Sequence, residues 1–331
     1  MPPGEGGYRQ INKALNICVF KDYLESQQRC LPTLLDVEEL SPRVIRILGR
    51  TQADLFEQFT LQGTNTFIVG TGPKRLLIDT GQGIPDWADL ISRTLSASGI
   101  SLSHVLLTHW HGDHTGGVPD LIRMYPDLAS SIYKHTPSTT QQPIADGQIF
   151  HVEGATVRAV YTPGHTDDHM CFILEEESAM FTGDNILGHG TSAVEHLRTW
   201  METLRKMQAQ DCRQGYPAHG IVIADLRAKI AGELAQKLRR ERQVLKALVQ
   251  TKRDERGTGQ GQGQGRGKGS VTVQQLVAAI YGEGVEAGLR ELALEPFMDE
   301  VLRKLAEDGI VAFEVRKGVK KWFALEDFRT N

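Results

Sequence analysis

The chain has 331 residues, of which 37 are Lys or Arg and 41 are Asp or Glu, so its formal net charge is −4. This length suffices for one full hydrophobic core and a further small domain. The slightly acidic balance lacks the basic footprint of a dedicated nucleic-acid-binding protein, so we do not expect nucleic acid as a partner. No stretch approaches the roughly 18 consecutive apolar residues of a transmembrane helix, so we expect no membrane span.

The cysteine pattern and the N-terminus bear on the compartment. The four cysteines form no C-x-x-C pair, which is typical of reduced thiols. The opening residues, MPPGEGGYRQINKAL, lack the apolar core of a secretory signal. They also lack the acid-free, Arg- and Ser-rich pattern of a transit peptide. Together these features predict a cytoplasmic protein.

The first elements along the chain are an extension and a group of strands. Residues 1–42 are predicted to be an N-terminal extension, with a helical pattern over residues 11–24. Short apolar segments typical of buried strands follow at residues 44–48, 65–69 and 75–79. Residues 86–98 then repeat apolar side chains at spacings of three and four, which predicts a helix packed on the core.

The most informative motif is THWHGDHTGG at residues 108–117, directly after the apolar residues 105–107. Within six positions it places His109, His111, Asp113 and His114. Imidazole nitrogens and carboxylate oxygens are ligands that zinc-class ions prefer. The offsets between these residues fit neither one face of a helix nor one face of a strand. We therefore predict a loop that leaves a buried strand and lets the side chains converge on metal.

Three more candidate ligands follow, each in a turn after a short hydrophobic segment. His165 lies in TPGHT, Asp184 in FTGD and His219 in YPAHG. Such turns are the places where α/β folds present ligands. A lone histidine in a turn is more often a structural or surface residue, but the order and setting of these three favour metal ligands.

The second half begins with helical patterns and ends in a separate subdomain. Apolar stripes predict helices over residues 196–207 and 226–250. The basic stretch 237–242 is explained more simply by a solvated helix face than by nucleic-acid binding. Residues 257–269, GTGQGQGQGRGKG, are typical of a flexible linker. Helices are then predicted over residues 271–281 and 293–308, and a hairpin over 310–323. We thus predict domains at residues 43–250 and 270–331, joined by a linker at 251–269.

The motifs T-H-x-H-x-D-H, G-H-T, T-G-D and A-H-G resemble those of the metallo-β-lactamase superfamily, particularly its glyoxalase-like hydrolases. The resemblance implies an α/β fold, the αββα sandwich, with a site for two zinc ions at one edge. The C-terminal order of helix, helix and hairpin resembles a winged-helix-like subdomain. Carried over by position, one Zn²⁺ would be held by His109, His111 and His165, and the second by Asp113, His114 and His219. Asp184 would bridge them; true lactamases tend to have Cys there, which disfavours lactam hydrolysis.

Two acidic residues receive further roles. A pair of metal ions supplies hydroxide near neutral pH and polarises the carbonyl under attack. Asp113 could bind metal and also accept a hydrogen bond from the attacking water, so we give it a catalytic proton-transfer role as well. Asp79, in LLIDTG, matches a superfamily position that supports the metal loop. Its alternative is a carboxylate in a surface turn.

Two activities, a thioesterase and an endoribonuclease, would use the same chemistry. Longer strings favour the thioesterase, because GYRQINKALNICVF, FTLQGTNTFIVGTG and LIDTGQGIPDWADLI resemble fungal acyl-carrier-protein thioesterases of polyketide pathways. This likeness spans nearly the whole chain apart from the Gly/Gln linker. It implies that the partner is the acyl carrier protein domain of a non-reducing polyketide synthase. The substrate would be its polyketide acyl chain, released as atrochrysone carboxylic acid or a similar product.

Basic side chains are the candidates for docking this partner. A carrier protein is acidic, so complementary positive charge should help it bind. The candidates are the stretch 237–242 and four residues of the predicted hairpin, Arg316, Lys317, Lys320 and Lys321.

Overall fold

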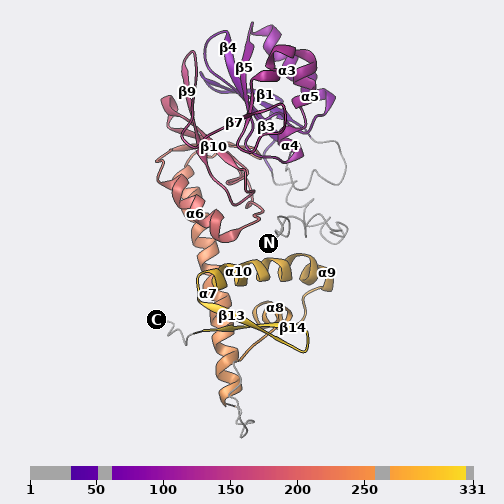
Figure 1. Cartoon of the computed structure of the whole chain (residues 1–331), viewed down its shortest axis with the longest axis vertical. Helices are drawn as coiled ribbons and strands as arrows, with labels where there is room; N and C mark the ends of the chain where they lie inside the picture. The colour runs from indigo at the N-terminus through magenta and orange to yellow at the C-terminus, as the bar shows by residue number, and fades with distance from the viewer. Residues whose placement is uncertain (1–30, 51–61, 258–268, 326–331) are drawn as a thin grey trace. The chain divides into compact units, whose positions relative to one another are not determined.

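The computed structural model describes residues 31–50, 62–257 and 269–325 (Figure 1). The helical pattern predicted over residues 11–24 lies outside these residues. Within them the chain divides into two compact units. The large unit comprises residues 31–194 and 199–231, and the small unit residues 195–198, 232–257 and 269–325.

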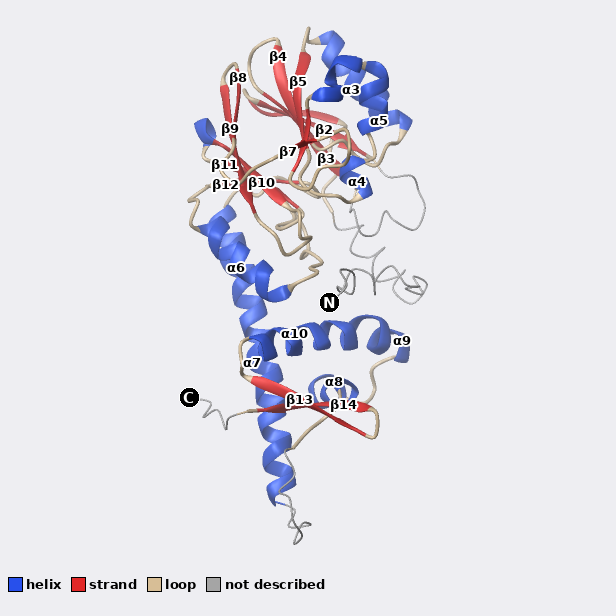
Figure 2. Ribbon diagram, viewed as in Figure 1, coloured by secondary structure: helices blue, strands red, loops and turns tan. Residues whose placement is uncertain are grey.

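The large unit contains two β-sheets (Figure 2). The first has seven strands in sequence order: β1 (Val37–Ser41), β2 (Val44–Gly49), β3 (Thr64–Val69), β4 (Lys74–Ile78), β5 (Ser101–Leu106), β6 (Ile132–Lys134) and β7 (Gln142–Pro143). The second has the order β12 (Gln214–Pro217), β11 (Ala179–Gly183), β10 (Met170–Leu174), β9 (Ala155–Tyr161) and β8 (Ile149–Val152). Strands β4 to β7 are parallel, as are β11 and β12, and the remaining neighbours are antiparallel.

The parallel pairs require crossover connections, and helices supply all of them except the one from β6 to β7. Helix α3 (Pro85–Ala97) joins β4 to β5, whereas α4 (Gly112–Thr115), α5 (Val118–Met124) and the 3-10 turn Pro126–Ser130 join β5 to β6. Helix α6 (Leu197–Gln208) joins β11 to β12. Another 3-10 turn, Glu175–Glu177, lies between β10 and β11.

Alternation along the strands builds the layers, because successive side chains point to opposite faces of a sheet. On β4, Leu76 and Ile78 join a core cluster with residues of the second sheet such as Phe172. The intervening Leu77 joins another cluster, with Trp87 of α3. The two sheets therefore pack face to face and α3 covers the outer face of the first.

The second sheet is covered by α6. Its residues Trp200, Met201 and Leu204 are buried, and Thr203 Oγ1 donates to the carbonyl of Pro163 beyond β9 (2.6 Å). These layers form the αββα sandwich that the family resemblance implied. One difference concerns residues 1–42: the part assigned to an N-terminal extension contains β1, the edge strand of the first sheet.

The small unit contains most of the long helix α7 (Leu226–Gly257), followed by α8 (Val273–Tyr281), α9 (Ala287–Leu289), a π-helical turn (Arg290–Leu294) and α10 (Glu295–Glu307). Strands β13 (Val311–Arg316) and β14 (Val319–Ala324) close it as a hairpin. Lys317 and Gly318 both have positive φ, as a two-residue hairpin turn requires. The predicted order of helix, helix and hairpin is therefore observed, and none of the described helices is long and apolar enough to cross a membrane.

Helix α7 explains the basic stretch 237–242. Lys237 and Glu241 are buried, and Glu241 pairs with Lys304 of α10 at 2.7 Å. Arg239 and Arg242 are exposed on the opposite side. The side chains of this stretch are therefore distributed over a buried and an exposed face of one helix, and they do not form a single basic surface.

Candidate metal centre

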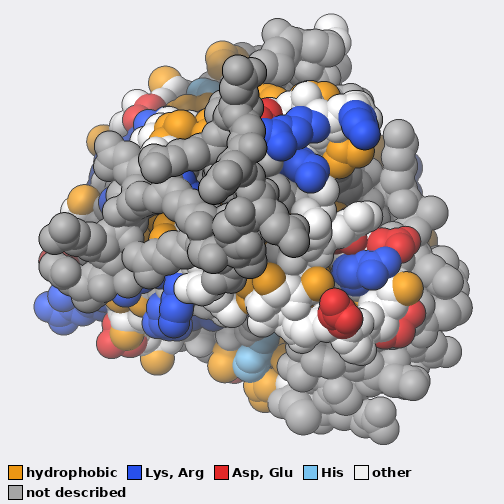
Figure 3. All heavy atoms as spheres, turned by 90° about the horizontal axis from the view of Figure 1, so that it is seen from below, with side chains coloured by type: hydrophobic (Ala, Val, Ile, Leu, Met, Phe, Trp, Pro, Cys, Tyr) orange, Lys and Arg blue, Asp and Glu red, His pale blue; other side chains and the backbone are white. Residues whose placement is uncertain are grey.

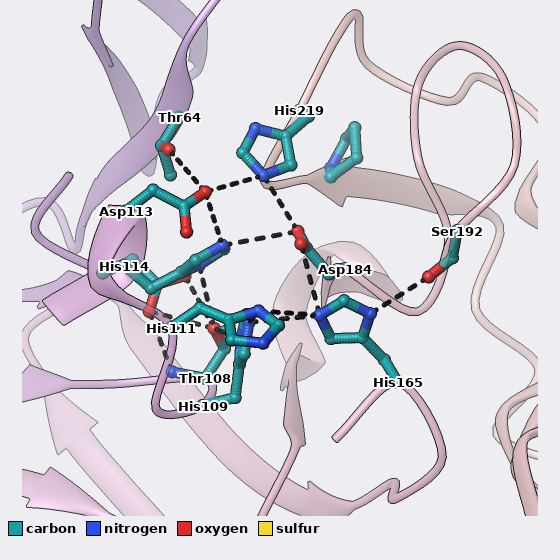
Figure 4. A network of polar contacts seen from close by, with 12 residues as sticks. Thr64, Thr108, His109, His111, Asp113, His114, His165, Asp184, Ser192 and His219 are labelled. Atoms are coloured by element: carbon teal, nitrogen blue, oxygen red, sulfur yellow. Dashed lines mark hydrogen bonds and ion pairs between the residues drawn. The ribbon is translucent and has the colours of Figure 1, made fainter. Parts of the chain in front are cut away.

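The seven predicted ligands come from the loops that follow four strands, and the fold brings all seven together (Figure 4). The segment after β5 carries His109, His111, Asp113 and His114, and the segment after β9 carries His165. Asp184 directly follows β11, and His219 lies in the loop after β12. Part of the first segment is not a loop, since Asp113 and His114 lie in the single helical turn α4. The ring of His114 lies against that of His109, with centroids 4.1 Å apart, whereas Asp113 faces His114 and His219.

One cluster consists of His109, His111, His165 and Asp184, all buried. His109 Nε2 lies 2.8 Å from His111 Nδ1, and His165 Nε2 lies 3.3 Å and 3.1 Å from these two atoms. Two nitrogens bound to one tetrahedral zinc stand about 3.3 Å apart. The three imidazoles therefore present nitrogen atoms at spacings close to those of a zinc site.

The second cluster consists of Asp113, His114 and His219. Asp113 Oδ2 lies 3.4 Å from His114 Nε2 and 3.3 Å from His219 Nε2.

Asp184 stands between the two clusters. Its Oδ1 faces His219 Nε2 (3.2 Å) and His114 Nε2 (3.5 Å), whereas its Oδ2 faces His165 Nε2 (3.5 Å). One carboxylate thus presents a separate oxygen to each cluster.

Hydrogen bonds fix the tautomers of three of these histidines. The Nδ1 atoms of His165, His219 and His114 contact acceptors: the carbonyl of Ala193 (2.6 Å), the carbonyl of Gly63 (3.1 Å) and the carboxylate of Asp79 (2.8 Å). A carbonyl or carboxylate oxygen only accepts, so Nδ1 carries a proton in each ring and Nε2 is left for a ligand. His114 Nε2 and Asp184 Oδ1 are buried without a hydrogen bond among the described residues. These features fit a divalent metal ion.

The local charges separate the histidines into two groups. Burial lowers the pKa of His111 to about 3, helped by the neighbouring His165. Burial likewise lowers the pKa of His109 well below its ordinary value. In contrast, burial is outweighed by Asp184 and Asp113 at His219, whose pKa rises to about 10. The three imidazoles of the first cluster are therefore neutral and ready to bind a cation, whereas the histidines of the second cluster hold protons that a cation would displace.

The two carboxylates are ionised in this environment. Burial opposes their charge, but His219 and His114 hold the pKa of Asp184 well below its usual range. His114 and His219 do the same for the pKa of Asp113. Both side chains therefore retain the charge that a metal ligand needs.

Asp79 supports the first loop, as predicted. It follows β4 with a positive φ of 57°, and its Oδ1 accepts a hydrogen bond from the backbone N–H of Thr108 (2.8 Å). Its Oδ2 binds His114 Nδ1. One buried carboxylate thus holds the start of the loop and orients a ring of the second cluster.

Several residues around the site were not predicted. Thr64 Oγ1 lies 3.4 Å from Asp113 Oδ2, and Ser192 Oγ lies 3.3 Å from His165 Nδ1 (Figure 4). His169 is fully buried beside the first cluster, with its ring centroid 5.2 Å from that of His109. The only sequence feature that could have pointed to His169 is its position, four residues after the predicted ligand His165. Trp110, between two predicted ligands, is 51% exposed and stands beside His111.

Comparison with known proteins gives the family. A family model described as the metallo-beta-lactamase superfamily matches residues 59–219. The lactamase-like protein notP of Aspergillus sp. (strain MF297-2) is 76% identical, over 98% of this chain and 99% of its own length. A protein named atrochrysone carboxyl ACP thioesterase from Cryptosporiopsis sp. (strain 8999) is 70% identical over 98% of both chains. One of the same name from Aspergillus terreus is 66% identical over 97% of this chain and 98% of its own.

Solved structures share the fold at low sequence identity. A beta-lactamase domain protein from Burkholderia ambifaria matches with a TM-score of 0.68 and 16% identity, over 89% of this chain and 95% of its own. A metallo-beta-lactamase family protein from Thermus thermophilus matches with a TM-score of 0.60 and 19% identity, over 86% of this chain and 100% of its own. Together with the near full-length relatives and the His/Asp clusters, these matches establish that this chain belongs to the metallo-β-lactamase superfamily.

Proposed function

We propose that this chain is a zinc-dependent thioesterase that acts on the acyl carrier protein of a non-reducing polyketide synthase. It hydrolyses the thioester between carrier and polyketide chain and releases atrochrysone carboxylic acid or a similar product. The observation that carries the proposal is the pair of relatives named atrochrysone carboxyl ACP thioesterase, 70% and 66% identical over almost the whole length. Because these near full-length relatives are named thioesterases, the chain is an enzyme of the hydrolase class.

The residues divide into the roles that the sequence suggested. His109, His111 and His165 would hold one Zn²⁺, Asp113, His114 and His219 the second, and Asp184 would contact both. When bound, such a pair of ions supplies a nucleophilic hydroxide near neutral pH and polarises the carbonyl under attack. The chain contributes the neutral imidazoles, the two ionised carboxylates and the fixed orientation of the rings.

Asp113 is the residue to which we assign proton transfer. Its side chain is 17% exposed, whereas that of His114 is fully buried, so Asp113 is the more accessible to water. As a water oxygen attacks the thioester carbon, the Asp113 carboxylate can take the proton that the water loses. The carbon–sulfur bond then breaks, and the thiolate leaves without needing a strong acid. The proton held by Asp113 passes to that thiolate.

The nuclease alternative receives less support. Its substrate would need a continuous basic surface to follow a phosphate backbone. On the face shown in Figure 3, Lys and Arg side chains form several separate groups beside hydrophobic and acidic ones. The near full-length relatives named atrochrysone carboxyl ACP thioesterase favour the thioesterase instead.

The test compares wild type, H109A and the control H151A, which changes an exposed histidine on β8. Each metal-loaded protein is given a polyketide-loaded carrier protein and, separately, a short single-stranded RNA. We expect free acid from wild type and H151A, none from H109A, and intact RNA throughout. RNA cleavage with an inert carrier substrate would overturn the thioesterase in favour of a nuclease.

A further inference from the structure

His169 is a fully buried histidine that the predicted ligand set does not use. It directly precedes β10, and its ring lies against the residue that follows β11. The backbone N–H of Asp184 donates a hydrogen bond to His169 Nε2 at 3.1 Å. Through this bond His169 contacts the backbone of the one carboxylate that faces both clusters.

The hydrogen bond defines what His169 can and cannot do. A backbone N–H only donates, so Nε2 must be the acceptor and the ring proton must lie on Nδ1. Nδ1 lies 3.0 Å from Thr162 Oγ1, which can accept that proton, and 2.9 Å from the side-chain amide nitrogen of Asn185. The backbone N–H of Thr162 in turn donates to the carbonyl of His169 (3.0 Å). Because Nε2 is engaged with the backbone, His169 is not available as a metal ligand, although it adjoins the cluster.

Gly183 provides independent support for this contact. It has a φ of 50°, and a Cβ atom built on it would lie 2.4 Å from His169 Nε2. A separation below 3.0 Å cannot be accommodated without movement. The residue before Asp184 therefore has to lack a side chain for the imidazole to reach the N–H of Asp184.

We propose that His169 is a positioning residue that holds Asp184 in register between the two clusters. The Asp184 carboxylate must direct one oxygen to His114 and His219 and the other to His165, at 3.2–3.5 Å. This arrangement depends on the place of its backbone at the end of β11, where the chain leaves the sheet. His169 fixes that place from the neighbouring strand. The inference rests on the proposed metal assignment but not on the substrate.

The first test replaces His169 with Leu or with Gln and measures metal affinity by chelator competition. Leu fills the space without an acceptor, whereas the amide oxygen of Gln can reach the position of Nε2. Removing a partner that orients a metal ligand typically costs 10- to 100-fold in metal affinity. We expect about that loss in H169L and a loss of no more than about threefold in H169Q. Equal losses in both variants would overturn the proposal.

A second measurement separates positioning from a purely structural role. Thermal unfolding of each variant is followed with and without zinc. Positioning predicts that H169L unfolds near the wild-type temperature without metal and gains less stability when zinc is added. A lower Tm without metal, with the full wild-type gain on adding zinc, would show that the ring only fills the core.

Gly183 gives a test that remains if H169L fails to fold. The G183A substitution is made in wild type and in H169Q, and metal affinity is measured in all four proteins. The flexible Gln can withdraw from the added methyl group, so G183A should cost less affinity in H169Q than in wild type. Equal costs would show that the contact does not matter. A wild type that binds zinc but leaves carrier thioesters intact would refute the substrate and leave the role of His169 standing.

Discussion

The candidate metal centre and the β13–β14 hairpin use charged side chains in opposite ways. At the metal centre the charges are buried and paired, since His114 lies at ion-pair distance from Asp79 and Asp184, and Asp184 lies at ion-pair distance from His219. On the hairpin Arg316 and Lys317 are exposed beside apolar side chains such as Phe313 and Val315, which are 53% and 63% exposed. Buried charges interact strongly, whereas exposed charges are screened by water and salt. The metal centre is thus suited to chemistry and the hairpin to reversible contact.

Metal removal should have the largest effect on activity, and that effect should be confined to the metal centre. We expect chelation to lower thioester hydrolysis by at least about 1000-fold, since the centre otherwise lacks its nucleophile and electrostatic stabilisation. The fold should survive, because His114 and His219 balance the neighbouring carboxylates in the metal-free chain. Activity after chelation and after zinc is restored, with far-UV circular dichroism on both samples, checks this. Loss of secondary structure on chelation would make the site structural.

Substitution of Asp113 should separate its role in proton transfer from its role in metal binding. We expect D113N to lower kcat by about 100-fold, the scale of a lost general base. Because the amide oxygen can still face the cluster, part of the metal should remain. Steady-state kinetics and metal analysis of the same preparation test both points. Full turnover by D113N would remove the proton-transfer role.

The pH dependence of metal binding should distinguish the two clusters. Burial opposes protonation of His114 and His219, but the neighbouring carboxylates raise the pKa of His114 well above its ordinary value and that of His219 to about 10. At pH 7 both rings are therefore protonated without metal, and zinc must displace about two protons. Affinity should accordingly rise with pH, by up to about 100-fold per pH unit below the raised pKa values.

Calorimetry in two buffers of different ionisation enthalpy counts these protons. The matched variant H219A should release about one proton fewer than wild type. H111A should release as many as wild type, since the pKa of His111 lies at about 3 and its ring is already neutral. Binding without proton release would contradict the charge assignment.

The sequence predicted those parts of the molecule that have a local signature. The seven candidate ligands occur in short motifs after apolar segments, and the fold brings them together. The hairpin over residues 310–323 was equally recognisable, and in the structure Lys317 and Gly318 form its turn. Strand β1 was missed because its sequence, VEELS, lacks the apolar alternation of a buried strand and lies at the edge of the sheet.

Other features arise only from tertiary contacts. His169 acts on the backbone of Asp184, fifteen residues away, and a contact to a backbone N–H leaves no mark on the partner's side chain. The basic stretch 237–242 forms one cluster in the sequence, yet Lys237 and Glu241 turn inward. Glu241 meets Lys304, a residue far along the chain that the local pattern could not reveal.

Charge reversal on the hairpin should have the smallest effect and should depend on the partner. If the hairpin docks an acidic carrier protein, R316E/K317E should lower kcat/KM for the carrier-bound substrate by about three- to tenfold at low salt and less at high salt. A small free thioester should be hydrolysed at the wild-type rate, because the buried centre is unchanged. The matched control R93E/R123E reverses two exposed charges of the large unit and should affect neither substrate. Equal losses on both substrates in R316E/K317E would show that the hairpin acts through folding, and no loss on either would remove it as the docking surface.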